Sequence, residues 1–334
     1  MKKMLFARLV VAFLIQLPFS VHALPYSNLY VFGDSLSDIG NDSIVTGGVI
    51  PPPEYTDGTT HGRFTDGRNY IDYLSQGLGL TVTPSLAGGT DYAYGGARTG
   101  YRASASPFAA SLLEQRDSYL ASLGGGAADP NALYVVWGGS NNLSDILGRV
   151  MADPTYDPTS DLNATAADLG NVVASLAAAG ARNILVPNVP DLGIIPAVTA
   201  ISGGAPNPLV SNFVMNFNLG LAGLLNNIGS SFPGVDLMRL DVFGLLDQVY
   251  ANPADYGLTN VTDTCYSGYV TPGGTTCSNP EQYLFWDLEH PTTATHRILA
   301  VNALRTVPEP ATVALIALGL VVLGASKKVS GRPE

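Results

Sequence analysis

Short apolar runs alternate along the chain with longer segments whose apolar residues recur at helical spacing. Several of these runs lack the polar–apolar alternation of a half-exposed strand and are typical of strands covered on both faces. The predicted strands are residues 29–32, 133–137, 184–186 and 235–240, and the predicted helices are residues 69–78, 104–123, 162–179, 209–228 and 292–304. Strands that alternate with helices predict a parallel sheet with helices on both faces, in one α/β domain. Residues 151–160, rich in Asp and Pro, are predicted to form a loop.

The first 23 residues have the pattern of a secretory signal peptide. Lys2, Lys3 and Arg8 surround the start of an apolar stretch, residues 9–19, and Ala23 ends the segment. A basic start, a short apolar core and a small final residue are typical of a cleaved signal. The apolar core is shorter than the ~20 residues that a membrane span needs, so cleavage after Ala23 is expected rather than a permanent N-terminal anchor.

The C-terminal segment combines an apolar stretch with a basic tail. Residues 311–324 are apolar throughout, which is marginal for a membrane span, and Lys327, Lys328 and Arg332 follow. The basic residues would remain on the cytoplasmic side. Residues 308–310 (Pro-Glu-Pro), the apolar helix and the basic tail resemble the PEP-CTERM sorting signal. That resemblance implies a Gram-negative, exopolysaccharide-producing source and an exosortase that removes the helix and delivers the protein to the cell surface or beyond.

Without the two end segments, the predicted mature domain comprises residues 24–307. Residues 308–334 are the predicted sorting signal with its short transmembrane helix. All four lysines lie in the end segments, so the domain keeps ten arginines against twenty-five acidic residues, a formal charge of −15. A lysine-free acidic surface argues against nucleic acid or an anionic membrane as a partner. Nothing in the sequence indicates a cofactor.

The two cysteines, Cys265 and Cys277, enclose a loop rich in Gly and Pro. In a secreted chain such a pair favours a disulfide over two free thiols. Closing a loop of this size contributes about 3 kcal/mol in the chain-entropy model. Two cysteines without matching histidines make a poor zinc site.

The stretch FGDSLSDIGN, residues 32–41, follows the first predicted strand and places Ser35 where α/β proteins bind ligands. An ordinary turn has the same composition. A serine nucleophile needs a base, and the base needs a group that orients it. Asp287 and His290 stand three residues apart before a predicted helix and could supply both, although a D-x-x-H pair also arises by chance on surfaces.

Two glycine-rich turns are candidate hydrogen-bond donors for a developing oxyanion. GGSNN follows the second predicted strand and presents the side-chain amide of Asn141, and DYAYGGART could expose the backbone N–H of Gly96. Each stretch could equally be a turn that needs the conformational freedom of glycine.

In combination and in this order, FGDSLSDIGN, DYAYGGART, GGSNN and FWDLEHPTTATHRILA resemble the four blocks of the GDSL, or SGNH, hydrolase family. The segment HGRFTDGRNYIDYLSQGLGL also resembles the one that follows the first block in larger bacterial and plant lipase-like members. The resemblance implies a three-layer α/β/α, flavodoxin-like fold with a mainly parallel central sheet of about five strands. It makes Ser35 the nucleophile, His290 the base and Asp287 its orienting partner, with Ser35, Gly96 and Asn141 forming the oxyanion hole.

One residue departs from the family pattern. Asn142 stands where the family usually has an aspartate that supports its neighbour, and we expect a modified turn rather than an inactive site. Other hydrolase classes are disfavoured, because the chain has no G-x-S-x-G nucleophile elbow and no H-E-x-x-H metal motif.

These features predict a secreted serine esterase that hydrolyses carboxylic esters of short acyl chains or lipids through an acyl-enzyme. Two alternatives stay open. The sorting signal favours an O-acetyl esterase acting on surface exopolysaccharide, and Asn142 allows a catalytically silent surface or matrix protein on the same fold. The expected partners are an ester substrate, an exosortase and signal peptidase. The expected location is the cell surface or the medium, after transient anchoring in the inner membrane by the C-terminal helix.

Overall fold

A four-stranded parallel sheet forms the centre of the part of the chain that the computed structural model describes, residues 26–102 and 109–308. Its strands are β1 (Leu29–Gly33), β2 (Leu133–Trp137), β3 (Asn183–Pro187) and β4 (Asp236–Leu240), in the spatial order β1-β2-β3-β4. All four coincide with the apolar runs of the sequence. The predicted signal peptide, the predicted sorting helix and part of the predicted helix 104–123 lie outside the described residues.

The family resemblance implied a central sheet of about five strands, and the described main sheet has four. Beside β1, residues 90–94 run parallel to it without forming a regular strand. The amide of Val31 donates to Thr90 at 3.0 Å, and the amides of Tyr92 and Tyr94 donate to Val31 and Gly33 at 2.8 and 3.2 Å. This segment occupies the edge position and brings the glycine-rich turn that contains Gly96 next to the first strand.

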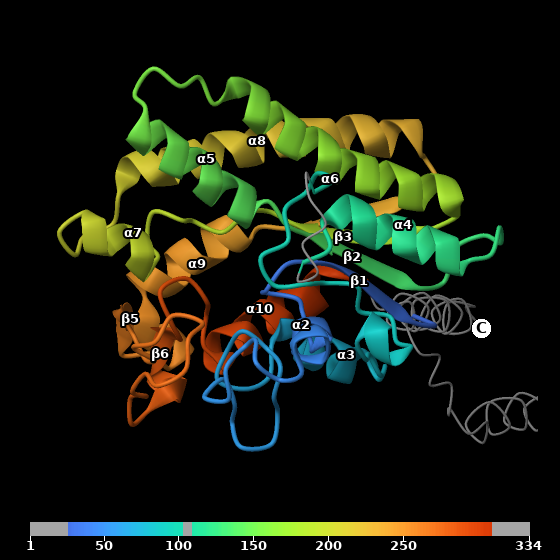
Figure 1. Cartoon of the computed structure of the whole chain (residues 1–334). Coiled ribbons are helices and arrows are strands. Elements are labelled where there is room, and N and C mark those ends of the chain that lie inside the picture. The colour runs from blue at the N-terminus through green and yellow to red at the C-terminus, as the bar shows by residue number, and fades with distance from the viewer. Residues whose placement is uncertain (1–25, 103–108, 309–334) are drawn as a thin grey trace, which may run out of the picture. The chain divides into compact units, whose positions relative to one another are not determined.

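Helices cover both faces of the sheet, as the alternating pattern predicts (Figure 1). The helices α4, α6 and α8 lie on one face, and α3 and α10 lie on the other. The α-helices of the described residues are α2 (Asn41–Thr46), α3 (Tyr70–Leu78), α4 (Leu112–Ser122), α5 (Ser140–Ala152), α6 (Thr159–Ala179), α7 (Pro196–Ile201), α8 (Pro208–Ser231), α9 (Val242–Ala251) and α10 (Thr293–Thr306).

Four helices, α2, α5, α7 and α9, were not predicted. The helices α2 and α7 are only six residues long, too short to show a helical period. The helix α5 opens with polar residues that resemble a turn, and it extends into the predicted loop 151–160, which the structure shortens to residues 153–158.

The helix α10 begins at Thr293, one residue after the predicted start. Thr292 is the N-cap, and its side chain accepts a hydrogen bond from the amide of Thr295. Threonine is a preferred N-cap because its hydroxyl satisfies an otherwise unpaired helix amide. Pro291 therefore precedes the cap and belongs to the loop that holds His290.

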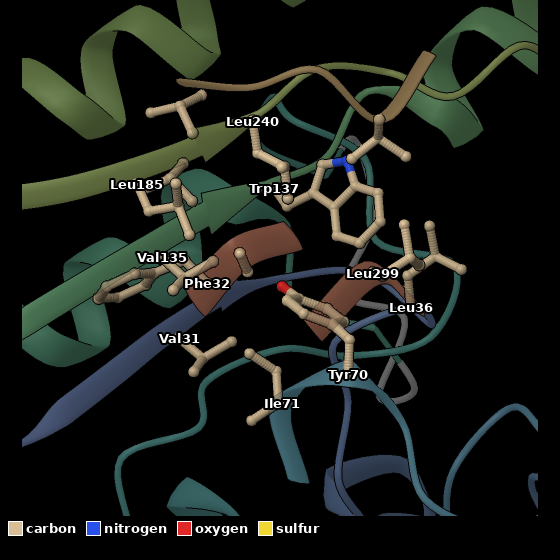
Figure 2. Packing of buried hydrophobic residues seen from close by; sticks show 14 of the residues in the cluster. Val31, Phe32, Leu36, Tyr70, Ile71, Val135, Trp137, Leu185, Leu240 and Leu299 are labelled. Atoms are coloured by element: carbon tan, nitrogen blue, oxygen red, sulfur yellow. The ribbon is translucent and has the colours of Figure 1, made fainter. Parts of the chain in front are cut away.

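Buried side chains from the strands and the neighbouring helices pack together in the core (Figure 2). Val31, Val135 and Leu185, on three adjacent strands, are fully buried. At the end of β2 the ring of Trp137 meets the ring of Tyr70 edge-on, with 5.1 Å between centroids. Close packing of this kind fixes the loops that leave the sheet.

A second, smaller unit of structure surrounds the cysteines. β5 (Asn260–Thr264) and β6 (Tyr283–Phe285) pair as a separate two-stranded sheet. Cys265 and Cys277 form the predicted disulfide. It packs in a small cluster with Tyr55, Tyr266 and Trp286.

Candidate active site

The loop after β1 is held by close packing and by one buried glutamine. A Cβ on Gly33 would lie 2.9 Å from the carbonyl oxygen of Trp137, so only glycine allows the two strand ends to approach. Gln115, on α4, accepts from the amide of Gly33 and donates to its carbonyl, both at 2.8 Å. Ser35 follows two residues later and is nearly buried. No local sequence pattern points to Gln115, because its role depends on where α4 packs.

The polar residues after Ser35 build the loop rather than the reaction centre. Asp38 accepts from the amides of Gly40 and Asn41, both at 2.7 Å. The side-chain amide of Asn41 donates to the carbonyl oxygens of Asp91 and Ala93, at 2.8 and 2.9 Å. The first and second sequence blocks are therefore bound to each other, although about fifty residues separate them.

Asp287 and His290 form a buried pair. The Nδ1 atom of His290 lies 2.7 Å from Oδ2 of Asp287, and Oδ1 of Asp287 accepts from the amides of Glu289 and His290 at 2.9 and 2.7 Å. Burial raises the pKa of Asp287, but His290 and the donors around the carboxylate outweigh it and hold the pKa below its usual value. The pair is thus poised as a carboxylate beside an imidazole.

Carboxylates also control the protonation of His290. Burial lowers the pKa of His290, but the negative charges of Asp287, Glu289 and Asp34 raise it to about 9. The Nε2 atom of His290 is buried and has no hydrogen-bond partner among the described residues. It lies 3.9 Å from a carboxylate oxygen of Glu289.

The segment after the first block positions the histidine loop. The ring of Phe64 packs against the ring of His290, with 5.4 Å between centroids. Thr65 donates to the carbonyl oxygen of Pro291 at 2.8 Å, and Asp66 accepts from the amide of Thr293 at 2.6 Å. These contacts give the GRFTDG stretch a physical role, which is to fix the start of α10 and the turn before it.

Ser35, His290 and Asn141 line the same pocket, at the carboxyl edge of the sheet. No hydrogen bond joins Ser35 to His290 within the described residues, so the two groups share a site without being engaged. A catalytic hydrogen bond is often long before substrate binds. The arrangement brings together residues that are 255 positions apart in the sequence.

The three candidate oxyanion donors, Ser35, Gly96 and Asn141, line a groove that adjoins this pocket at Ser35. Asn141 is in the first turn of α5, and its side-chain amide donates to the carbonyl oxygen of Ala97 at 3.1 Å, which leaves its second hydrogen available. Gly96 has φ of +70°, a left-handed conformation that favours glycine. Within residues 26–102 and 109–308, the amides of Ser35 and Gly96 donate to no other group. The N-terminus of α5 also adds its positive dipole end.

Comparison with known proteins identifies the whole domain. The family model of the GDSL-like lipase/acylhydrolases matches residues 29–302. The chain belongs to this family. It is therefore a GDSL esterase/lipase, within the carboxylic ester hydrolases.

Curated relatives of this GDSL hydrolase come from plants and bacteria. A GDSL esterase/lipase of Arabidopsis thaliana is 29% identical over 81% of this chain and 84% of its own length. Esterase EstA of Pseudomonas aeruginosa is 31% identical over 83% of this chain but only 46% of its own length. An α/β hydrolase from a Lake Arreo metagenome, LAE5, superimposes on 84% of this chain and 94% of its own, at 13% identity and a TM-score of 0.46.

The PEP-CTERM protein-sorting motif matches residues 306–328 of this GDSL hydrolase. The motif indicates an exported protein that an exosortase sorts to the cell surface.

The side chain of Asn142 in this GDSL hydrolase forms two hydrogen bonds with Thr99, and an amide suits both. Its Oδ1 accepts from the amide of Thr99 at 3.0 Å, and its Nδ2 donates to the hydroxyl of Thr99 at 3.3 Å. That hydroxyl in turn donates to Asp168 at 3.0 Å. An amide can donate and accept at once, whereas a carboxylate could only accept. The departure from the family pattern thus keeps the segment after Gly96 bound to α5.

Two different spaces meet at Ser35 in this GDSL hydrolase. One is a pocket lined largely by apolar side chains, among them Trp137, Leu192, Ile195, Val242, Leu246 and Phe285. The other is a more open groove, whose lining includes Arg98, Asp145 and Tyr269, and Glu289 borders both. Ser35, Asn141 and His290 border both. An ester bound across this border would have its acyl and alcohol parts in different surroundings.

Proposed function

We propose that this protein is a secreted serine esterase in which Ser35, His290 and Asp287 form a catalytic triad. The observation that supports the proposal most strongly is the buried His290. Its Nδ1 is held by Asp287, its Nε2 has no partner among the described residues, and it borders the same pocket as Ser35. A base with one nitrogen fixed and the other free is the arrangement that a serine nucleophile requires.

The reaction then proceeds in two halves. Oγ of Ser35 attacks the ester carbonyl carbon while Nε2 of His290 takes the hydroxyl proton, and the carbonyl π electrons move to the oxygen. When the tetrahedral intermediate collapses, the bond to the alcohol breaks and His290 protonates the departing alkoxide, which leaves an acyl-enzyme. Water, deprotonated by His290, attacks the acyl carbon. When the second intermediate collapses, the bond from that carbon to Oγ breaks, His290 returns its proton to Ser35, and the carboxylic acid leaves. Asp287 stabilises the imidazolium in both halves.

The oxyanion of both intermediates is held by the amides of Ser35 and Gly96 and by the side chain of Asn141. Replacing Asn141 with alanine should lower kcat by roughly 10²–10³-fold, because one donor to the developing charge is lost. Steady-state hydrolysis of p-nitrophenyl butyrate measures the effect. Asn226→Ala is the control, since Asn226 is exposed on α8 and lines neither space. An Asn141→Ala enzyme with the kcat of the control would remove Asn141 from the oxyanion hole.

The activity should have an alkaline optimum, because His290 must be neutral to accept a proton and its pKa is about 9. Well below pH 9, kcat/KM should rise about tenfold per pH unit. Glu289→Gln removes a negative charge 3.9 Å from Nε2 and should move the midpoint of this limb to lower pH. A pH profile of kcat/KM measures both effects, with Glu281→Gln as the control at an exposed site. A limb that is the same in all three enzymes would contradict the role of Glu289.

We propose that the acyl chain enters the apolar pocket and the alcohol lies in the polar groove. Apolar side chains favour burial of a hydrocarbon chain, and the pocket opposite the groove offers them. Arg98, Asp145 and Glu289 in the groove suit an alcohol with several hydroxyl groups. This polarity also favours a second candidate, an O-acetyl esterase that acts on surface exopolysaccharide. Initial rates on p-nitrophenyl esters of increasing acyl length and on acetylated glycans separate the two, and no hydrolysis of any ester would favour a silent scaffold.

We also propose the order of the cleavage steps during export. Signal peptidase would cleave after Ala23, the hydrolase domain would span residues 24–307, and the helix within residues 308–334 would anchor the chain in the inner membrane until exosortase removes it. The match to the sorting motif supports this sequence of events.

A further inference from the structure

Oδ2 of Asp287 accepts a second hydrogen bond besides that of His290. The hydroxyl of Tyr55 lies 2.5 Å from this oxygen, and Nδ1 of His290 lies 2.7 Å from it. Tyr55 is 1% exposed and comes from the loop between α2 and α3, more than two hundred residues away in the sequence. Burial and the charge of Asp287 both raise the pKa of Tyr55, so its hydroxyl stays protonated and remains a donor.

The hydroxyl of Tyr55 also accepts a hydrogen bond, from a residue of the disulfide loop. The amide of Val270 donates to it at 2.9 Å. Val270 has φ of +45°, and no other non-glycine residue described by the structure has a positive φ. This conformation is unfavourable for a β-branched residue and persists only where its surroundings enforce it. Val270 lies in the loop that the Cys265–Cys277 disulfide closes.

Aromatic packing fixes the ring of Tyr55 in the same place. Its ring meets Tyr266 and Trp286 edge-on, with centroids 5.4 and 5.7 Å away, and Tyr266 stacks on Trp286. The neighbouring Tyr269 lies over His290 and donates to Glu289. The disulfide loop therefore contacts both members of the Asp287–His290 pair, one of them through Tyr55.

We propose that Tyr55 is a positioning residue for the Asp287–His290 pair, acting through the oxygen of Asp287 that both donors share. The proposal rests on the proposed function, in which His290 is the base. Two donors divide the negative charge of one oxygen, so the Tyr55 hydroxyl limits how strongly Asp287 stabilises the imidazolium and prevents the carboxylate from rotating. A chain of hydrogen bonds thus connects the Val270 amide to Tyr55, Tyr55 to Asp287, and Asp287 to His290.

Several titratable groups face His290 and have to be held constant in any test. They are Asp34 from the loop after β1, Glu289 beside it, Tyr269 from the disulfide loop and His296 from α10, while Asp42 and Arg98 line the same groove. A variant that changes only the Tyr55 hydroxyl leaves all of these groups in place. Any change in the titration of His290 then comes from the shared oxygen.

Tyr55→Phe should lower kcat/KM by about tenfold, the usual scale for a lost hydrogen bond to a charged group. It should also move the acid limb of the pH profile to higher pH, because Asp287 then stabilises the imidazolium more strongly. The matched control is Tyr266→Phe, which removes a hydroxyl from the same aromatic cluster that contacts Thr271 and Gly274 but not Asp287. The control should leave the limb where it is. If the acid limb of Tyr55→Phe had the same midpoint as that of the wild type, Tyr55 would only fill space in the aromatic cluster, and the proposal would be wrong.

Two further measurements keep the inference testable by itself. In a Ser35→Ala background, the proton NMR resonance of His290 Nδ1–H reports the titration directly, so Tyr55 can be tested even if the wild type hydrolyses no ester and the proposed function fails. Incorporating 3-fluorotyrosine at position 55 keeps the ring and the hydroxyl but makes a stronger donor. The resonance should then titrate at lower pH than in wild type, and at higher pH in Tyr55→Phe. Identical titrations in all three proteins would overturn the inference.

Discussion

Ser35→Ala is expected to reduce ester hydrolysis on the order of 10⁴-fold or more, because the nucleophile is removed while the oxyanion donors remain. The fold should be unaffected, since the hydroxyl of Ser35 makes no hydrogen bond to any described residue. Two measurements check this result: kcat for p-nitrophenyl butyrate, and covalent labelling by a fluorophosphonate followed by mass spectrometry of the peptide that contains Ser35.

A second serine in the same loop gives the matched control. Ser37 shares a hydrogen bond of 2.9 Å with the buried hydroxyl of Tyr70. Ser37→Ala should therefore cost about 1 kcal/mol of unfolding free energy yet keep its fluorophosphonate label and most of its activity. Comparable hydrolysis by Ser35→Ala and the wild type would disprove the serine mechanism, whatever the outcome for Ser37.

The sequence predicted the elements whose pattern is local. The four strands of the described main sheet followed from apolar runs, and α3, α4, α6, α8 and α10 followed from helical spacing, whereas α5 and α9, both longer than α3, were missed. The pairing of Asp287 with His290 was implied by the family resemblance, because a D-x-x-H spacing alone also arises by chance. In the structure the carboxylate accepts two backbone amides and lies against the imidazole. The meeting of Ser35 with His290 required one more step. The rule that parallel strands present their carboxyl ends at one edge of the sheet places Ser35. His290 follows β6, outside the main sheet, so its place beside Ser35 was implied by the family resemblance and not by this rule.

The residues that sequence reasoning missed act over long distances. Tyr55 reaches Asp287 across 232 positions, and Gln115 reaches Gly33 across 82, so neither belongs to a local pattern. The irregular segment beside β1 has a similar origin. The carboxylate of Asp91 accepts from the amide of Ile39, in the loop after β1, and from the amide of Ala93 within the segment, at 2.8 and 2.9 Å. These contacts bind the segment to that loop and do not extend the strand ladder.

Asp287→Asn is the substitution with the second largest expected effect, a loss of kcat of roughly 10³–10⁴-fold. The carboxylate accepts four donors: two backbone amides on Oδ1, and His290 Nδ1 and the Tyr55 hydroxyl on Oδ2. An amide has only one acceptor atom. Keeping the two backbone contacts turns its NH₂ group toward His290, so Nδ1 must become the acceptor and the ring proton moves to Nε2. The base then has no free lone pair for the proton of Ser35.

The pH dependence of stability tests the same contacts from another side. The pKa of Asp287 is lowered in the folded protein, so its contribution to stability is present above the unfolded pKa and is lost as the pH falls through the folded pKa. The Asn variant should therefore be less stable than wild type at neutral pH, and this difference should shrink in strong acid. Urea unfolding at both pH values measures the difference, with Asp263→Asn on the exposed face of β5 as the control.

The direction in which the acid limb of the pH profile shifts distinguishes the loss of the negative charge of Asp287 from the loss of a hydrogen-bond donor to it. In Asp287→Asn the negative charge that raises the pKa of His290 is gone, so the residual activity should show its acid limb at lower pH than the wild type. Tyr55→Phe keeps that charge and removes only its second donor, so its limb should move the other way. If both variants moved the limb to lower pH, the Tyr55 hydroxyl would not weaken the stabilisation of the imidazolium by Asp287, and the inference about Tyr55 would be wrong. If Asp287→Asn left the limb in place, the charge of Asp287 would not set the pKa of His290, and the proposed triad would be wrong.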